Sequence, residues 1–151
     1  MAQTMSSHHE TQILPYTPQQ LFELVADVAC YPEFLPWCSA ARVTERTGDR
    51  FLGELVIHYK GMSESYTSRV TLTPYTAIDV AMVKGPFEYL TNNWRFTAEG
   101  GGTRIDFALD FKFRSKLLEK LMGGFFTRAT EKMMGAFKER AETLYGRKNN
   151  A

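Results

Sequence analysis

Apolar residues recur at two different spacings along the chain. Between residues 37 and 113 they occupy every second position in several runs, which predicts β-strands with one apolar and one polar face. The most regular run contains Ile105, Phe107, Leu109, Phe111 and Phe113. Short segments rich in Gly and Pro separate the runs, so consecutive strands are predicted to pair antiparallel.

Two segments have helical spacing instead. Thr17, Pro18 and Gln20 form an N-terminal capping signal, and the helix that follows is predicted to end before Pro32. A second helix of about 30 residues is predicted from Ser115 to the Tyr145–Gly146 stop signal. Its predicted apolar stripe is Leu118, Leu121 or Met122, Phe125, Ala129, Met133, Phe137, Ala141 and Leu144.

A glycine pair, Gly123–Gly124, interrupts this second helix, and glycine is less favourable there than alanine by about 1 kcal/mol. One explanation is a kink, and another is the close approach of a second backbone.

These elements predict a single α+β domain. A short first strand at 11–14 precedes the first helix, and six further strands follow, so the sheet has seven antiparallel strands. The long C-terminal helix is the element long enough to cover its apolar face. The predicted boundaries are a flexible N-terminal tail at 1–10, a domain at 11–146 and a C-terminal tail at 147–151.

One helix does not fill a strongly curved sheet, so an apolar cavity is predicted between the two. A fully packed core without a cavity is the alternative, because aromatic stripes at strand spacing are commonly core. The residues predicted to line the cavity are Trp37, Leu55, Ile57, Tyr59, Tyr66, Val70, Met82, Trp94, Phe107, Leu109, Phe111, Met122, Phe126 and Met133.

A proline-bracketed aromatic segment at 31–37 is the predicted gate of this cavity. Its gate residues are Pro32, Phe34, Leu35 and Pro36, of which Phe34 and Leu35 are expected to dip into a membrane.

Charge is distributed unevenly. The whole chain carries a net charge of +1, but residues 112–148 contain ten basic and four acidic residues and therefore carry +6. Such a segment suits an anionic surface, either lipid headgroups or RNA. The alternative is a long helix with a solvated basic face.

The motifs of common enzyme classes are absent from the sequence. It contains no G-x-S-x-G, H-E-x-x-H, P-loop or G-x-G-x-x-G motif. His58 is predicted on a polar strand face, and Asp106 and Asp110 are about 13 Å apart along one strand. We therefore expect no catalytic residues, no metal site and no cofactor other than a bound ligand.

The two cysteines, Cys30 and Cys38, are too few for a disulfide framework, so they are expected to be reduced. The polar N-terminus resembles neither a signal peptide nor an arginine-rich transit peptide, and no apolar run reaches the roughly 18 residues that span a membrane. These features predict a cytoplasmic protein, with peripheral contact at the inner face of a membrane.

The segment Tyr31-Pro32-Glu33-Phe34-Leu35-Pro36-Trp37-Cys38 resembles the signature of the coenzyme Q-binding START-domain family. That family lies within the polyketide cyclase/START superfamily and includes bacterial relatives named as ribosome association toxins. Gly85-Pro86-Phe87, Trp94-Arg95-Phe96 and the segment 136–146 extend the resemblance over about residues 11–146. It implies a helix-grip (START/Bet v 1-like) fold, a hydrophobic tunnel, and a chaperone-like role with ubiquinone in respiratory electron transfer.

Three functions remain open from the sequence. The first is a non-enzymatic carrier of an isoprenoid quinone or related lipid, held by burial of apolar surface. The second is a ribosome-binding regulator, with which the +6 segment is compatible, although it lacks an aromatic–basic nucleic-acid motif. The third is a cyclase-type enzyme, for which no acid–base pair is visible. DNA is not an expected partner.

Overall fold

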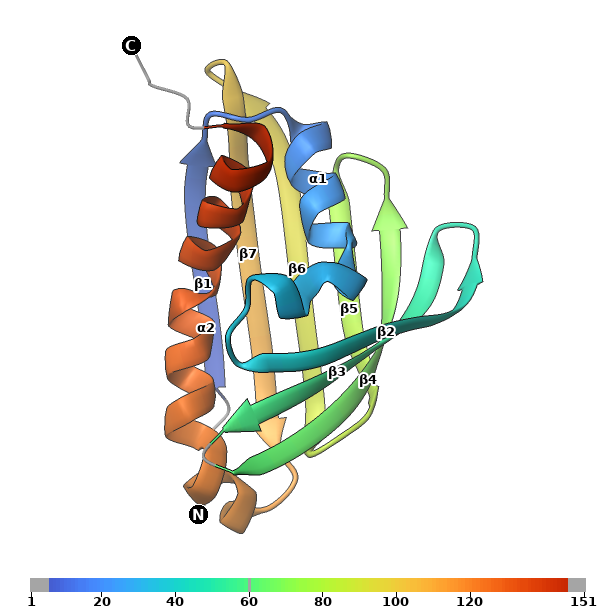
Figure 1. Cartoon of the computed structure of the whole chain (residues 1–151), viewed down its shortest axis with the longest axis vertical. Coiled ribbons are helices and arrows are strands. Elements are labelled where there is room, and N and C mark those ends of the chain that lie inside the picture. The colour runs from blue at the N-terminus through green and yellow to red at the C-terminus, as the bar shows by residue number, and fades with distance from the viewer. Residues whose placement is uncertain (1–5, 60, 147–151) are drawn as a thin grey trace.

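The computed structural model describes residues 6–59 and 61–146. It contains a single curved sheet with helices on its concave side (Figure 1). The strands are β1 (Ser6–Leu14), β2 (Cys38–Thr47), β3 (Arg50–Tyr59), β4 (Met62–Thr73), β5 (Ala77–Lys84), β6 (Phe87–Glu99) and β7 (Gly102–Phe113). The helices are α1 (Pro18–Ala26), the 3-10 helix η1 (Val28–Glu33) and α2 (Lys116–Tyr145).

The sheet order is β1-β7-β6-β5-β4-β3-β2, and every neighbouring pair is antiparallel. The predicted seven-stranded helix-grip fold is therefore confirmed. Register shifts in the β2–β3, β4–β5 and β6–β7 pairs mark bulges, which bend strands and increase their twist. Figure 1 shows the resulting curvature, with β2, β3 and β4 crossing in front of the long strands.

The predicted helix caps agree with the structure. The Thr17 hydroxyl accepts a hydrogen bond from the Gln20 amide, and the Gln20 side chain accepts one from the Thr17 amide, at 3.1 and 3.0 Å. The Ser115 hydroxyl caps α2 by accepting a hydrogen bond from the amide of Leu118. After α1 the chain continues into η1, which contains Pro32, so the proline falls in a tight 3-10 turn instead of ending the α-helix directly.

The first strand is longer than predicted. The predicted tail 1–10 and the predicted strand start at Thr11 are corrected by β1, which begins at Ser6 and pairs with β7 from Ser6↔Phe111 to Leu14↔Thr103. The polar residues at the start of β1 gave no alternating apolar pattern from which the strand could be predicted. An edge strand is held by backbone hydrogen bonds, which do not require apolar residues. Residues 1–5 and 147–151 lie outside the described residues.

The apolar stripe of α2 agrees with the predicted one at Met122, Ala129, Phe137 and Ala141 and differs from it elsewhere. The buried residues are Met122, Phe126, Ala129, Thr130, Met134, Phe137 and Ala141, whereas Leu121 and Leu144 are exposed. A close backbone approach at Gly123–Gly124 is also wrong, since a Cβ atom there would meet only Glu119 at 3.8 Å or Arg128 at 3.9 Å.

Candidate functional site

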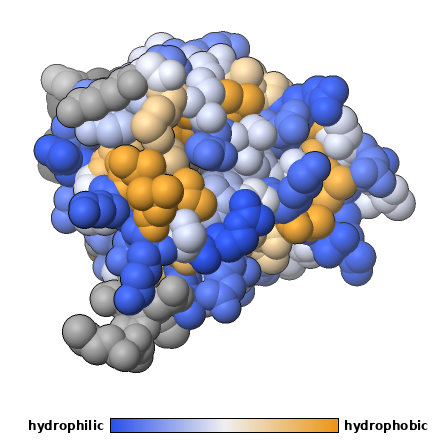
Figure 2. Space-filling view, turned by 90° about the horizontal axis from the view of Figure 1, so that it is seen from below, coloured by the Kyte–Doolittle hydropathy of each residue, from blue (hydrophilic) through white to orange (hydrophobic). Residues whose placement is uncertain are grey.

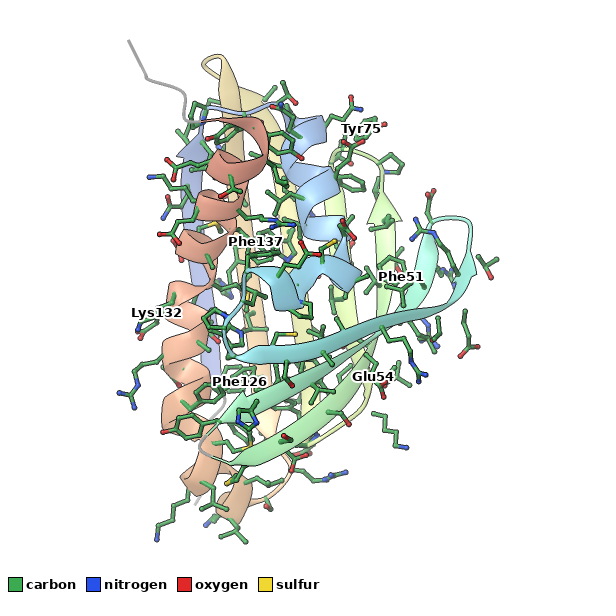
Figure 3. The ribbon with its side chains drawn as sticks, viewed as in Figure 1. Phe51, Glu54, Tyr75, Phe126, Lys132 and Phe137 are labelled. Atoms are coloured by element: carbon green, nitrogen blue, oxygen red, sulfur yellow. The ribbon has the colours of Figure 1, made fainter. Side chains whose placement is uncertain are left out.

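An apolar cavity lies between the concave face of the sheet and the middle of α2. Its volume is about 80 Å³, and its walls come from η1, from β2 to β7 and from α2. Figure 3 shows Phe126 and Phe137 directed from α2 towards the sheet, while Lys132 points away from it. The predicted cavity is therefore present, although it is small.

Nine of the predicted lining residues line this cavity. They are Trp37, Leu55, Ile57, Tyr66, Val70, Trp94, Leu109, Phe126 and Met133. On the strands they occupy the face that alternation assigned to the interior, so no strand is shifted by one residue.

Five predicted residues do not line the cavity. Phe107 and Phe111 are buried against Trp94 and Phe126, with ring centroids 4.8 and 4.7 Å apart, and Met122 lies in the same core. Tyr59 stacks on Phe125 with centroids 4.2 Å apart, and Met82 is half-buried against the core. For the four strand residues, alternation assigned the correct face but did not show where along the strands packing leaves space.

Thirteen lining residues were not predicted as cavity residues. They are Val28, Tyr31, Leu35, Cys38, Gly53, Ser68, Val80, Leu90, Asn92, Phe125, Ala129, Thr130 and Phe137. Ser68 and Asn92 carry only a weak sequence signal, in that each is a single polar residue at an inward position between two apolar ones.

The predicted gate needs correction. Leu35 is only 3 % exposed and lines the cavity, so it is not available to enter a membrane. Phe34 packs edge-on against Phe137, and the Arg140 guanidinium lies 5.1 Å above its ring centroid. Pro36 is exposed and Pro32 is half-buried within η1. This segment therefore fastens η1 to the second half of α2.

Polar groups in the cavity are few and uncharged. Among the described residues the lining contains no Asp, Glu, His, Lys or Arg, and its polar side chains are hydroxyls, two indoles, one amide and one thiol. Asn92 is hydrogen-bonded at both ends of its amide, since its Nδ2 donates to the Ala108 carbonyl at 3.0 Å and its Oδ1 accepts from Trp94 Nε1 at 2.8 Å.

Burial also controls ionisation in the cavity. It raises the pKa of the Tyr31 and Tyr66 hydroxyls well above their usual range and raises the pKa of the Cys38 thiol. All three groups are therefore neutral at physiological pH. Cys30 and Cys38 are free, and a hydrogen bond with Asp27, together with burial, raises the pKa of Cys30 to about 11.

Metal-binding geometry is not found in the part of the chain that the structure describes, where no three His, Cys, Asp or Glu side chains converge. Asp106 accepts a hydrogen bond from Thr11 at 2.8 Å, and Asp110 pairs with His9 and Ser7 on β1. These carboxylates therefore link the two strands. His58 is exposed and contacts Ser63.

An exposed apolar patch occurs at the start of α2. Leu117 and Leu121 are 66 % and 50 % exposed, and Arg114, Lys116 and Lys120 are exposed nearby in the sequence. Figure 2, which faces this end of the molecule, shows an apolar patch bordered by hydrophilic side chains. None of the described helices has the length and apolar character needed to span a membrane.

Known proteins resemble this chain over nearly its whole length. Residues 14–138 match the family model described as polyketide cyclase / dehydrase and lipid transport. The ribosome association toxin RatA of Rickettsia prowazekii is 48 % identical over 144 residues, which are 93 % of this chain and 99 % of that protein.

A mitochondrial protein and a solved bacterial structure are also similar to this chain. The mitochondrial coenzyme Q-binding protein COQ10 homolog B of Xenopus laevis is 29 % identical, over 93 % of this chain and 59 % of that protein. The solution structure of the 18 kDa protein CC1736 from Caulobacter crescentus has a TM-score of 0.74 at 37 % identity, over 94 % of this chain and 99 % of that one. The resemblance seen in the sequence is thus confirmed. The chain belongs to the polyketide cyclase / dehydrase and lipid transport family.

Proposed function

We propose that the chain binds a hydrophobic ligand in the cavity beneath α2 and acts as a carrier or chaperone for it. The single observation behind this proposal is the cavity itself, whose lining is apolar apart from a few neutral polar groups. Such a lining favours a ligand that is mostly hydrocarbon, because burial contributes about 25 cal/mol per Å² of apolar surface. Ubiquinone or a related isoprenoid lipid fits this chemistry, and the name of the Xenopus relative supports it.

The ligand requires the cavity to enlarge. Its volume of about 80 Å³ is well below the roughly 300–1,000 Å³ of ordinary ligand pockets. Met133 and Phe125 are half-buried lining residues on α2. The unbranched Met133 side chain changes shape readily. We therefore propose that outward movement of these side chains, together with this part of α2, admits the ligand.

A carrier role without catalysis accords with the lining. General acid–base chemistry uses groups whose pKa lies near the working pH, whereas the cavity presents hydroxyls and a thiol with raised pKa values. The family description also includes cyclases, so the enzyme hypothesis remains testable. A pH–rate profile with ionisations near neutrality on a polyketide substrate would favour it.

The test of the carrier proposal is native mass spectrometry of protein purified from a quinone-producing host, with organic extraction of the same sample. We expect a mass increment that extraction identifies as an isoprenoid quinone or lipid. Phe126→Trp, which adds volume at the cavity wall, should remove the increment, while Leu144→Trp on the exposed side of α2 should retain it. A clean unliganded mass, with no uptake of added short-chain ubiquinone, would contradict the proposal.

Transfer of such a ligand requires contact with a membrane, and we propose the apolar patch at the start of α2 as the contact surface. The two exposed leucines suit the acyl boundary, and Lys116, Lys120 and Arg114 suit anionic headgroups. An anionic bilayer fits this combination better than RNA does, because exposed leucines gain nothing from a phosphate backbone. This placement would keep the protein peripheral to the membrane.

Ribosome association is a second candidate, favoured by the name of the Rickettsia relative and by exposed basic residues on α2. The proposed contact residues are Arg128, Lys132 and Lys138, which lie away from the cavity lining. Co-sedimentation with ribosomal subunits should then fall steeply with salt and be lost on charge reversal of Arg128 and Lys132. Failure to co-sediment at low salt would exclude this candidate.

A further inference from the structure

One cavity residue has an unusual environment. Ser68 lies on β4 between Tyr66 and Val70, lines the cavity and is only 4 % exposed. Its Oγ has no hydrogen-bond partner among the described residues. A buried hydroxyl without a partner costs free energy that alanine at the same position would avoid.

Two other buried hydroxyls among the described residues have hydrogen-bond partners. Thr103 Oγ1 donates to the Tyr16 carbonyl at 2.7 Å, and Thr130 Oγ1 donates to the Phe126 carbonyl at 2.9 Å. Thr130 is a useful comparison, because it lines the same cavity from α2 with its hydroxyl already occupied. Ser68 therefore differs from these threonines, because it lines the cavity and its Oγ has no partner among the described residues.

The pairing of β4 with β5 is interrupted by a bulge beside Ser68. Thr67 pairs with Lys84 but Ser68 pairs with Met82, so Val83 is the extra residue of a bulge on β5. Bulges commonly re-aim side chains next to functional sites. The neighbouring inward residue Tyr66 adds a second hydroxyl to the lining, and burial keeps it protonated.

We infer that Ser68 Oγ is the hydrogen-bond donor for an oxygen of the bound ligand, so that the cavity selects apolar molecules carrying a carbonyl or ether oxygen over pure hydrocarbons. This inference rests on the proposed ligand-binding function. A carbonyl oxygen has no hydrogen of its own and two lone pairs, so it accepts from Ser68 and has room for a second donor such as Tyr66. The quinone ring is one chemical class with such oxygens.

The test uses two probes with the same carbon skeleton. Duroquinone and durene are both tetramethylated six-membered rings, and duroquinone has two ring C=O groups where durene has two ring C–H groups. NMR titrations of the wild-type protein and of Ser68→Ala give the dissociation constant of each probe. We expect the wild type to prefer duroquinone, and Ser68→Ala to weaken duroquinone by about fivefold while leaving durene unchanged.

Thermal unfolding of the free proteins supplies a second readout. Ser68→Ala should raise the melting temperature, because it removes an unsatisfied buried hydroxyl, whereas Thr130→Ala should lower it by removing a made hydrogen bond and a buried methyl group. A lower melting temperature for Ser68→Ala would show that its hydroxyl is already bonded and would overturn the inference.

The possible outcomes distinguish the role of Ser68 from the proposed ligand-binding function. Equal wild-type affinity for the two probes, unchanged in Ser68→Ala, would overturn the role of Ser68 and leave ligand binding standing. Failure of the wild type to bind either probe or short-chain ubiquinone would remove the proposed function and the inference with it.

Discussion

Two parts of α2, which we call its first half (residues 116–133) and its second half (residues 134–145), are held in different ways. In the second half, Tyr145 donates a hydrogen bond to the Gln20 carbonyl at 3.0 Å, and Arg140 pairs with Glu33 at 2.8 Å. The helix end is also fixed, because Tyr16 donates to the Gly146 carbonyl at 2.9 Å. In the first half, no hydrogen bond or ion pair between described residues joins a side chain of 116–133 to another element.

Between the described residues, the contacts of the first half are therefore apolar packing. Phe126 fits among Phe87, Phe111 and Phe113, and Phe125 stacks on Tyr59. Five of the six cavity-lining residues of α2, from Phe125 to Met133, come from this half. The difference teaches that one helix has two roles, in which its polar-bonded half is fastened to the fold and its apolar half covers the cavity, which would have to open for the proposed ligand.

The largest expected difference is in the loss of stability when Phe137 or Phe125 is replaced by alanine. Phe137 is buried against Tyr31, Phe34 and Trp94, so Phe137→Ala should destabilise the protein by about 3–5 kcal/mol. Phe125 is half-buried, so Phe125→Ala should cost only about 1 kcal/mol. Urea denaturation measures both values. Equal losses would mean that the two halves of α2 are equally fastened.

The next effect concerns the patch at the start of α2. Replacing Leu117 and Leu121 together by serine should weaken binding to anionic vesicles by about tenfold, since less apolar surface enters the bilayer. Leu144→Ser is the matched control, because Leu144 is 48 % exposed at the opposite end of the same helix. Vesicle co-sedimentation measures the binding. A loss of the same size in the control would refute a specific contact surface.

A glycine comparison tests the mobility of the first half. Gly124→Ala and Gly135→Ala meet no close contacts, so each should stabilise the protein by about 1 kcal/mol. Only Gly124→Ala lies in the first half of α2, and it should slow the uptake of short-chain ubiquinone. Stopped-flow quenching of tryptophan fluorescence gives the rates. Equal slowing by both variants would contradict a difference in mobility between the halves.

The smallest expected effect is a pH dependence of stability that arises from the ion pair between Glu33 and Arg140 in the second half of α2. The Arg140 guanidinium beside Glu33 lowers the pKa of that carboxyl below its unfolded value. A lowered folded-state pKa stabilises the protein at neutral pH, and this contribution is lost as the pH falls through that pKa. Melting temperatures should therefore fall slightly more for the wild type than for Glu33→Gln between about pH 5 and pH 3. Parallel curves would show that the ion pair contributes nothing.

The sequence predicted the sheet well and the helix less well, for a physical reason. Strand alternation has two possible faces, and runs such as 105–113 leave no doubt about which is apolar. The long helix carries adjacent apolar pairs, Phe125–Phe126 and Met133–Met134, so its pattern does not fix the rotation about its axis. The predicted stripe was accordingly displaced by one residue at both pairs.

The sequence predicted where in the fold the cavity lies, but it did not predict which inward-facing residues line it. Alternation places side chains on the inner face, whereas the space left between them depends on three-dimensional packing that sequence spacing does not contain. Phe107 and Phe111 illustrate this limit, because they face inward and yet are surrounded by other rings. Ser68 was missed because a single polar residue in a strand of serines and threonines carries a weak signal.

Amide hydrogen exchange along α2, with and without short-chain ubiquinone, tests the central claim most directly. In the free protein, the backbone from Leu121 to Met133 should exchange faster than that from Met134 to Tyr145. The quinone should slow exchange in the first segment and leave the second nearly unchanged. Uniform exchange along the helix, or the same pattern with and without quinone, would contradict a ligand cavity covered by the apolar half of α2.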